Sequence, residues 1–244
     1  MKKFVTAVLL AVTLVLVLVS CTGKAGPTGP QGQTGTAGPV QPGLYYMRIF
    51  QQGGVYSGTY SGQVQASINN SYSFAHYTDA NNPIAVGYND ISMTTRAILK
   101  FDLSSLPSSK IIVDKAELTI NTNGVSNNGG AQNVTVHKVT NTWTVFQAGW
   151  GLNTNTTDWN IYGGDFDSHT MTASASYNLP PSSALTIPLD TAVVQGWMMN
   201  PLTNYGMFFK CTNESTFNYS EIYSSNAVTP SNRPMLKVWY YTTE

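Results

Sequence analysis

From about Leu44 to the end of the chain, apolar and polar residues alternate in short runs. A period of two gives a strand one apolar face and one polar face, which is typical of antiparallel sheets. Turn-forming clusters such as NTNGVSNNGG at 121–130 separate the runs. The clearest apolar positions are Ala97, Leu99 and Phe101, Ala116, Leu118 and Ile120, Val134 and Val136, Leu185, Ile187 and Leu189, and Leu236, Val238 and Tyr240.

One segment departs from this period. In DTAVVQGWMMN, residues 190–200, Val193, Val194 and Trp197 share one helical face, and Asp190 is a suitable N-cap. The sequence therefore predicts an all-β fold with one short helix. The roughly 200 residues from 44 to 244 are enough for a single antiparallel β-sandwich domain.

The first twenty residues have a different character. Lys2 and Lys3 precede an apolar run at 4–19, which is the pattern of a secretory signal peptide and is short for a membrane-spanning helix. Leu-Val-Ser-Cys at 18–21 resembles the bacterial lipobox. That resemblance implies a signal peptide at 1–20 and a lipid on Cys21, with more than one acyl chain giving stable membrane anchoring. An uncleaved membrane anchor is the alternative.

A collagen-like segment follows the cysteine. Together, Cys21 and this segment form a predicted linker at 21–43. Glycine recurs at every third position, namely Gly23, Gly26, Gly29, Gly32, Gly35 and Gly38. Only glycine fits at the axis of a collagen triple helix, and six such triplets would extend about 55 Å. Two interpretations remain open: a spacer that lifts the domain off a membrane, and a short stalk that associates three chains.

Composition narrows the class of partner. Charged residues are 10% of the chain, below the roughly 25% of ordinary soluble domains. Without Lys2 and Lys3 the chain has ten basic and twelve acidic side chains, so its net charge is −2. No basic patch stands out, and nucleic acid is not an expected partner. Once Cys21 carries lipid, Cys211 has no cysteine to pair with, and its alternating run MFFKC predicts a small core residue.

Several stretches resemble one known family. They include FDLSSLP at 101–107, NTW at 141–143, WNIYGGDFD at 159–167, WMMNPLTNYG at 197–206 and RPMLKVWY at 233–240. In order and spacing, residues 46–244 resemble a DNRLRE-domain protein, a family related to secreted carbohydrate-binding modules. The resemblance implies a β-sandwich of jelly-roll type, found on exported and surface proteins.

These stretches also have structural explanations. Arg96 begins a strand whose other face is apolar, so its charge needs an acceptor such as Asp102 or a backbone carbonyl. Phe101, Trp143 and Trp197 are large enough to contribute strongly to a core. We therefore expect these residues to stabilise the fold.

No catalytic motif occurs in the chain. The nucleophile elbow, the phosphate-binding loop, the zinc-protease helix and the dinucleotide glycine loop are all missing, and His76, His137 and His169 are scattered. The sequence therefore predicts that the protein is not an enzyme.

The stretch TTDWNIYGGDFDSHT at 156–170 holds the strongest local cluster of polar groups. Asp165 and Asp167 would face the same side of a strand, beside the turn at Gly163 and Gly164. Calcium prefers several oxygen ligands, so a structural calcium on Asp165 and Asp167 is one hypothesis. A transition-metal site that includes His169 and a solvated edge without any ion are the alternatives.

Aromatic residues near the same stretch offer a second hypothesis. Trp150, Trp159 and Tyr162 lie among Gly, Asn and Thr rather than in an alternating core run. Flat rings stack on the C–H faces of sugars, so these three side chains are candidate polysaccharide ligands. The alternative is that they cover one end of the sandwich.

Together these patterns predict a lipid-anchored protein of the bacterial cell envelope, outside the cytoplasmic membrane on the cell surface or the outer membrane. Its β-sandwich would recognise a polysaccharide without catalysis. The alternative is a structural or adhesive surface protein with protein partners and no glycan site.

Overall fold

The computed structural model describes residues 43–54, 58–71, 83–89, 92–127 and 132–243. The chain divides into two units, Met1–Val40 and Gln41–Glu244, and the second unit contains all the described residues. The signal peptide at 1–20, the lipid site at Cys21 and the Gly-X-Y repeat lie outside the described residues and remain predictions.

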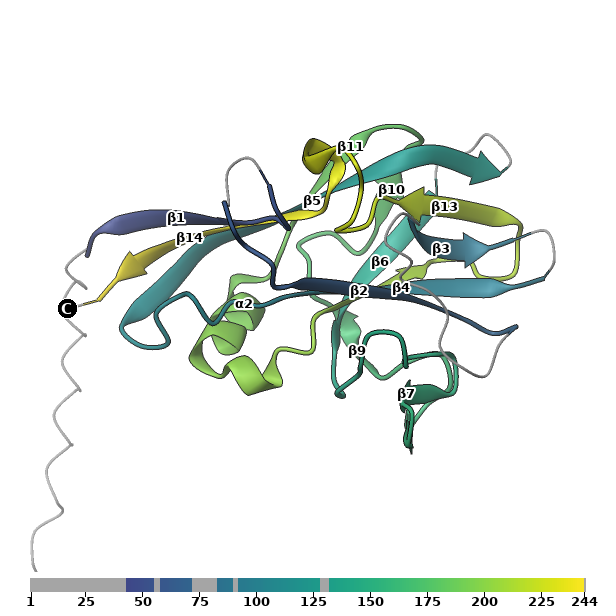
Figure 1. Cartoon of the computed structure of the whole chain (residues 1–244), viewed down its shortest axis with the longest axis horizontal. Coiled ribbons are helices and arrows are strands. Elements are labelled where there is room, and N and C mark those ends of the chain that lie inside the picture. The colour runs from purple at the N-terminus through teal and green to yellow at the C-terminus, as the bar shows by residue number, and fades with distance from the viewer. Residues whose placement is uncertain (1–42, 55–57, 72–82, 90–91, 128–131, 244) are drawn as a thin grey trace, which may run out of the picture. The chain divides into compact units, whose positions relative to one another are not determined.

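The domain is built from antiparallel strands that form two sheets (Figure 1). The first sheet has the order β1 (Tyr45–Phe50), β14 (Met235–Thr242), the first part of β5 (Ile111–Asn127) and β11 (Ala184–Pro188). The central part of the second has the order β10 (Tyr177–Leu179), β6 (Gln132–Val139), β12 (Met207–Cys211), β4 (Thr94–Phe101), β3 (Ile84–Tyr88) and β13 (Asn218–Ile222).

Further strands extend this frame. β2 (Gln63–Asn69) pairs with β4, and β9 (Phe166–Thr170) pairs with β6. The long strand β5 pairs with β14 and β11 in its first part and with β13 in its last part, so it continues from one sheet into the other. A small separate hairpin joins β7 (Leu152–Thr154) to β8 (Thr157–Asp158).

Both sheets contribute to one apolar core. Leu118, Leu236 and Val238 come from the first sheet, and Leu99 and Phe209 come from the second. The predicted alternation is confirmed in β14 and, up to Asn123, in β5, where it is interrupted only by the adjacent exposed residues Asp114 and Lys115. The described domain is therefore an antiparallel β-sandwich, as the sequence predicts.

The alternation fails in β4, where both faces are covered. Ala97 and Leu99 face the main core, yet Ile98 between them is fully buried as well. Ile98 belongs to a second apolar cluster with Ile68, Val139, Ala148, Trp159 and Phe208. Segment 140–165 contributes Ala148 and Trp159, so it covers this part of the second sheet.

The predicted helix is present as α2 (Thr191–Met199). Asp190 is its N-cap, and its carboxylate accepts a hydrogen bond from the Ala192 amide at 2.8 Å. Val194, Trp197 and Met198 are buried, and Val193 packs against the core from a partly buried position. Two short 3-10 helices, η1 (Pro201–Thr203) and η2 (Pro230–Asn232), complete the regular elements. No helix within the described ranges is both long and apolar enough to cross a bilayer.

The first and last strands lie side by side at one end of the domain (Figure 1). The register pairs Tyr45 with Tyr241 and Phe50 with Leu236, and the Thr242 amide donates to the Leu44 carbonyl at 3.1 Å. Strand β1, which follows the predicted linker, therefore begins next to the end of the last strand. The buried core extends from Phe50 to Tyr240, so a chain beginning at Gln41 contains all of it.

Candidate functional site: the surface around strand β1

The sequence predicts ligand contacts at Trp150, Trp159 and Tyr162. Most of the segment that carries them packs against the sandwich. Trp159 is only 3% exposed and packs in the second apolar cluster. Its indole nitrogen donates a hydrogen bond to the Gly149 carbonyl at 2.9 Å. Because neither its ring face nor its N–H reaches the surface, Trp159 stabilises this segment and cannot stack on a sugar.

The other two predicted aromatic contacts differ from Trp159 and from each other. Trp150 is partly buried, and the guanidinium carbon of Arg96 lies 4.7 Å from the centre of its ring. Tyr162 is 71% exposed. The three rings therefore do not form one exposed platform, which favours the alternative that this segment covers the sandwich.

Arg96 holds the segment in place. Its Nε and Nη2 atoms donate to the two carboxylate oxygens of Glu214 at 2.8 and 2.7 Å, and its Nη1 donates to the Gly163 carbonyl at 2.7 Å. The expectation of a carbonyl acceptor is confirmed, but the carboxylate is Glu214. Asp102 instead accepts a hydrogen bond from the Ser104 amide at 2.8 Å.

The glycine pair beside Arg96 meets a steric need. Gly163 and Gly164 have φ angles of 90° and 105°, which other residues rarely adopt. A Cβ on Gly164 would lie 2.5 Å from the Phe208 ring, and one on Gly163 would collide with Arg96. The predicted tight turn is therefore required for the segment to approach β4 and β12.

Asp165 is surrounded by hydrogen-bond donors. Its carboxylate accepts from the Ile161 amide, from the amide and side chain of Asn160, and from the Asn141 side chain, all at 2.8–2.9 Å. Burial alone would raise its pKa, but these hydrogen bonds outweigh burial and lower it. Three of these hydrogen bonds reach Oδ2 and one reaches Oδ1, so amide donors already hold most of this carboxylate in place.

Asp167 does not complete a metal site. Its carboxylate accepts from the His169 amide at 3.0 Å and lies 3.2 Å from the His169 ring, and both side chains are solvent-exposed. Hydrogen bonds from His169 lower the pKa of Asp167. Among the described residues, no three His, Cys, Asp or Glu side chains cluster closely enough to hold a metal ion.

The remaining residues singled out by sequence are structural. Phe101 and Trp197 are buried in the main core. Trp143 is half-buried, and its indole nitrogen donates to the Tyr205 carbonyl at 2.8 Å. Cys211 is buried beside the Gln132 side chain, and burial raises the pKa of its thiol to about 12. Cys211 is therefore a core residue, as predicted, rather than a reactive thiol.

A different surface carries one exposed tyrosine beside two partly buried aromatic rings. On the solvent-facing side of the first sheet, the antiparallel register aligns Tyr45 with Tyr241 and Met47 with Trp239. Ile112 and Lys115 of β5 extend these two rows across the sheet. We call this surface the outer aromatic face; it consists of Tyr45, Met47, Ile112, Lys115, Trp239 and Tyr241.

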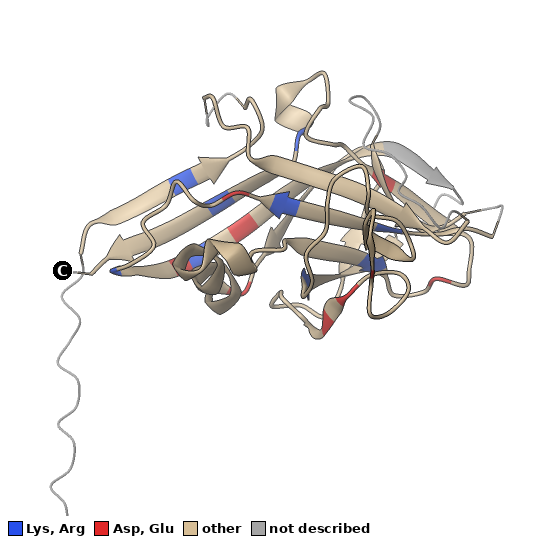
Figure 2. Ribbon diagram, turned by 60° about the horizontal axis from the view of Figure 1, so that its bottom comes forward, with Lys and Arg blue, Asp and Glu red and all other residues tan. Residues whose placement is uncertain are grey.

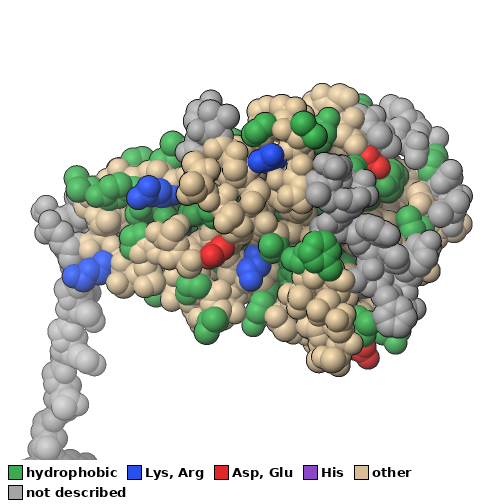
Figure 3. Space-filling model, viewed as in Figure 1, with side chains coloured by type: hydrophobic (Ala, Val, Ile, Leu, Met, Phe, Trp, Pro, Cys, Tyr) green, Lys and Arg blue, Asp and Glu red, His purple; other side chains and the backbone are tan. Residues whose placement is uncertain are grey.

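The side chains of the outer aromatic face are held by their neighbours. The ring centres of Tyr45 and Tyr241 are 4.6 Å apart, and Tyr45 is 50% exposed. The ammonium of Lys115 lies 4.9 Å from the centre of the Trp239 ring and 2.7 Å from the Glu117 carboxylate. Figure 3 shows hydrophobic side chains together with Lys or Arg over β1.

A bulge adds polar groups to this face. The register of β5 against β14 shifts between Trp239 and Tyr240, which leaves Asp114 without a partner opposite it. The Tyr45 hydroxyl donates to the Asp114 carboxylate at 3.0 Å. Figure 2 shows Lys, Arg, Asp and Glu as scattered positions along the ribbon. The bulge thus places hydrogen-bonding groups directly beside the aromatic rings.

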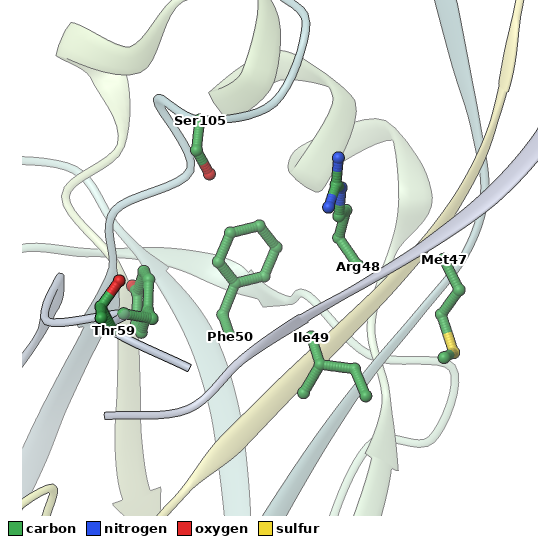
Figure 4. A pocket seen from close by; sticks show the side chains of 7 residues that line it. Met47, Arg48, Ile49, Phe50, Thr59 and Ser105 are labelled. Carbon is green, nitrogen blue, oxygen red and sulfur yellow. The ribbon is translucent and has the colours of Figure 1, made fainter. Parts of the chain in front are cut away.

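A cavity of about 490 Å³ lies beside β1 (Figure 4). Arg48 and Phe50 project from β1 toward it, while Met47 and Ile49 lie on the other side of the strand. Thr59, Tyr60 and Ser105 line the part of the cavity away from β1. The strand therefore separates the outer aromatic face from this cavity.

The sequence analysis missed this surface because it depends on long-range pairing. Tyr45 and Tyr241 become neighbours only when the first and last strands pair. The signal lies in KVWYY at 237–241, where Trp239 and Tyr241 alternate with buried residues, and in Tyr45 at the start of YYMRIF at 45–50. Two strands with aromatic residues at polar-face positions would have indicated an exposed ring surface.

Comparisons with known proteins add little to this geometry. No protein-family model matches the chain, and no curated protein matches it. A solved structure with some similarity is a chain of the mud crab tombus-like virus, determined by cryo-electron microscopy. It is 10% identical, the alignment covers 91% of this chain and 90% of that chain, and the TM-score is 0.29. A likeness of this size carries no argument, and the resemblance to DNRLRE-domain proteins stays a prediction.

Proposed function

We propose that this chain is a non-catalytic recognition module of the bacterial cell envelope and that its outer aromatic face binds polysaccharide. Lipid on Cys21 would anchor the protein outside the cytoplasmic membrane. The linker at 21–43 would then display the domain, either as a single chain or as a trimeric stalk.

The observation that carries the proposal is the contact of the exposed Tyr45 ring with the partly buried Tyr241 ring, next to the partly buried Trp239, on a paired sheet. The face of an aromatic ring is electron-rich, so it attracts the weakly positive C–H groups on the flat side of a sugar ring. Sheet pairing holds these rings, and rigid contacts lose little conformational entropy on binding.

Polar groups around the rings support the same function. Asp114, Lys115 and Glu117 lie within hydrogen-bonding reach of side chains on the face. Sugar hydroxyls need both donors and acceptors, and this mixture of carboxylates and an ammonium supplies both. A shallow face of this kind suits a polymer that extends across it better than a small enclosed ligand.

A protein partner is the second candidate, and the free edge of β1 favours it. Within the described residues, β1 pairs only with β14, so its other edge offers unpaired backbone groups. An extended segment of another protein could add to that edge as a further strand. This candidate corresponds to a structural or adhesive surface protein without a glycan site.

Affinity electrophoresis of residues 41–244 tests the proposal. The gels would contain acidic and neutral polysaccharides, including polygalacturonate, its carboxyl-reduced form, xylan and a β-glucan. We expect at least one polymer to retard the parent domain. The double variant Tyr45→Ala/Tyr241→Ala should bind that polymer at least tenfold more weakly, which corresponds to about 1.4 kcal/mol.

Tyr162→Ala is the matched control, because Tyr162 is an exposed ring outside the face. It should bind like the parent. If no polymer retards the parent, the protein-partner candidate replaces the glycan proposal. If Tyr162→Ala loses binding while the double variant keeps it, the binding surface is the 140–165 segment instead.

A further inference from the structure

Arg48 differs from the other arginines of the chain. Arg96 is bound to Glu214 and Gly163, and Arg233 donates to the carbonyls of Ala227 and Gln52. In the part of the chain that the structure describes, no hydrogen bond, ion pair or ring contact involves the Arg48 guanidinium. Its five N–H donors are therefore available to a ligand.

The cavity around Arg48 combines apolar and polar walls. Phe50 is buried beneath it and presents an apolar surface, and Thr59 and Ser105 contribute hydroxyl groups. The Tyr60 hydroxyl donates to the Asp102 carbonyl at 3.2 Å, and burial raises its pKa, so this hydroxyl stays protonated.

Among the described residues that line the cavity, none is acidic. The nearest carboxylate along the 102–105 turn is that of Asp102, which accepts from the Ser104 amide. A guanidinium with no carboxylate among its wall residues favours an anionic ligand, since the planar fork of arginine matches a carboxylate in two parallel hydrogen bonds.

An aromatic ring lies next along the same side of β1. Tyr46 precedes Arg48 by two residues, so their side chains project in the same direction. The Tyr46 ring stacks on Tyr240 with centres 5.5 Å apart and is 38% exposed. A sugar ring placed over Tyr46 would bring its neighbour in a polymer toward Arg48.

We infer that this cavity binds the carboxylate of a uronic-acid residue in an acidic polysaccharide, with Arg48 as the charged contact and Tyr46 as the stacking surface for the adjacent sugar. This inference rests on the proposed function, because it names the class of polysaccharide that would bind around β1. The polymer would contact the outer aromatic face and cross the edge of β1 into the cavity.

The test compares polygalacturonate with the same polymer after its carboxyl groups have been reduced to alcohols. The parent domain, residues 41–244, should bind polygalacturonate at least tenfold more tightly. Arg48→Gln should remove that preference and leave binding to the reduced polymer unchanged. Arg48→Lys should recover only part of it, because an ammonium keeps the charge but lacks the fork.

Lys237→Gln is the matched control, because it removes one positive charge from the outer side of β14 and not from the cavity. It should keep the preference for the acidic polymer. Arg48 is solvent-exposed, so thermal melts of its variants should match the parent.

Three results overturn the inference. If the parent binds both polymers equally, or if Arg48→Gln keeps its preference, the cavity is not a carboxylate site, and the glycan proposal survives through the outer aromatic face. If the parent binds neither polymer nor any other polysaccharide of the panel, both proposals fail together.

Discussion

Arg96 on β4 and Glu214, between β12 and β13, form a two-bonded ion pair with distances of 2.8 and 2.7 Å. Their side chains are 12% and 16% exposed. The same guanidinium binds the Gly163 carbonyl and lies over Trp150. One arginine therefore connects β4 to two loops that are distant in sequence, which explains why segment 140–165 is an ordered part of the sandwich.

Removing one member of this pair should destabilise the domain strongly. Glu214→Ala leaves a largely buried guanidinium without its carboxylate, and we expect a loss of about 3–5 kcal/mol in the free energy of unfolding. Lys115 and Glu117 provide the comparison, because their pair has the same 2.7 Å distance but is more exposed. Lys115→Met should cost less than about 1 kcal/mol. Urea denaturation of both variants measures the difference, and equal losses would contradict the structural role of Arg96.

Trp159 and Tyr162 should behave oppositely, although they are three residues apart. Trp159→Ala removes a buried ring from the second cluster and should cost about 3–5 kcal/mol. Tyr162→Ala removes an exposed ring and should change stability by less than about 0.5 kcal/mol. The denaturant midpoints of the two variants, compared with that of the parent, measure these changes in stability. A stable Trp159→Ala variant that had lost polysaccharide binding would restore this segment as the binding site.

Calcium should have no effect on the stability of the domain. Asp165 already accepts four hydrogen bonds, three of them at Oδ2, so a cation bound at that oxygen would have to displace amide donors. The melting temperature of the parent should be the same in calcium and in chelator. Asp165→Ala should melt lower than the parent by the same amount in both solutions, because the loss comes from unsatisfied N–H groups. A melting temperature that falls only in chelator would show that an ion binds.

Stability should fall as the solution becomes mildly acidic, because of His137. Burial lowers the pKa of His137 from 6.5, although hydrogen bonds to the carbonyls of Asp167 and His169 act against that shift. The unfolded chain then binds a proton more readily than the folded chain. The free energy of unfolding is therefore unaffected by His137 above about pH 6.5 and decreases below it. Urea midpoints between about pH 7 and pH 5 measure the slope. His137→Gln should flatten that slope, and an unchanged slope would assign it to other groups.

The sequence was sufficient for features that depend on local pattern. Alternation located the strands around Leu118 and Leu236, and the spacing of Val194 and Trp197 together with the Asp190 cap located α2. These features are set by residues close together in the chain, where periodicity and capping chemistry operate.

Features that depend on tertiary contact could not be predicted in the same way. Ile98 occupies a polar-face position by alternation, and it is buried because a later segment covers it. The acceptor of Arg96 lies 118 residues away, at Glu214. The outer aromatic face needs the pairing of the first strand with the last. Interleaved aromatics in a Gly- and Asn-rich stretch therefore suggested exposed rings at Trp159, where the fold instead uses the ring as core.

The most direct test of the account is a fluorescence titration that uses Trp239 as the reporter. Each polysaccharide of the panel, including polygalacturonate and its carboxyl-reduced form, would be added to residues 41–244, to Trp239→Phe, and to the Tyr45→Ala/Tyr241→Ala variant. The account predicts a saturable change in the parent that is missing in Trp239→Phe, with affinity at least tenfold weaker in the double variant. No saturable change in the parent, or an equal change in Trp239→Phe, would contradict binding at the outer aromatic face.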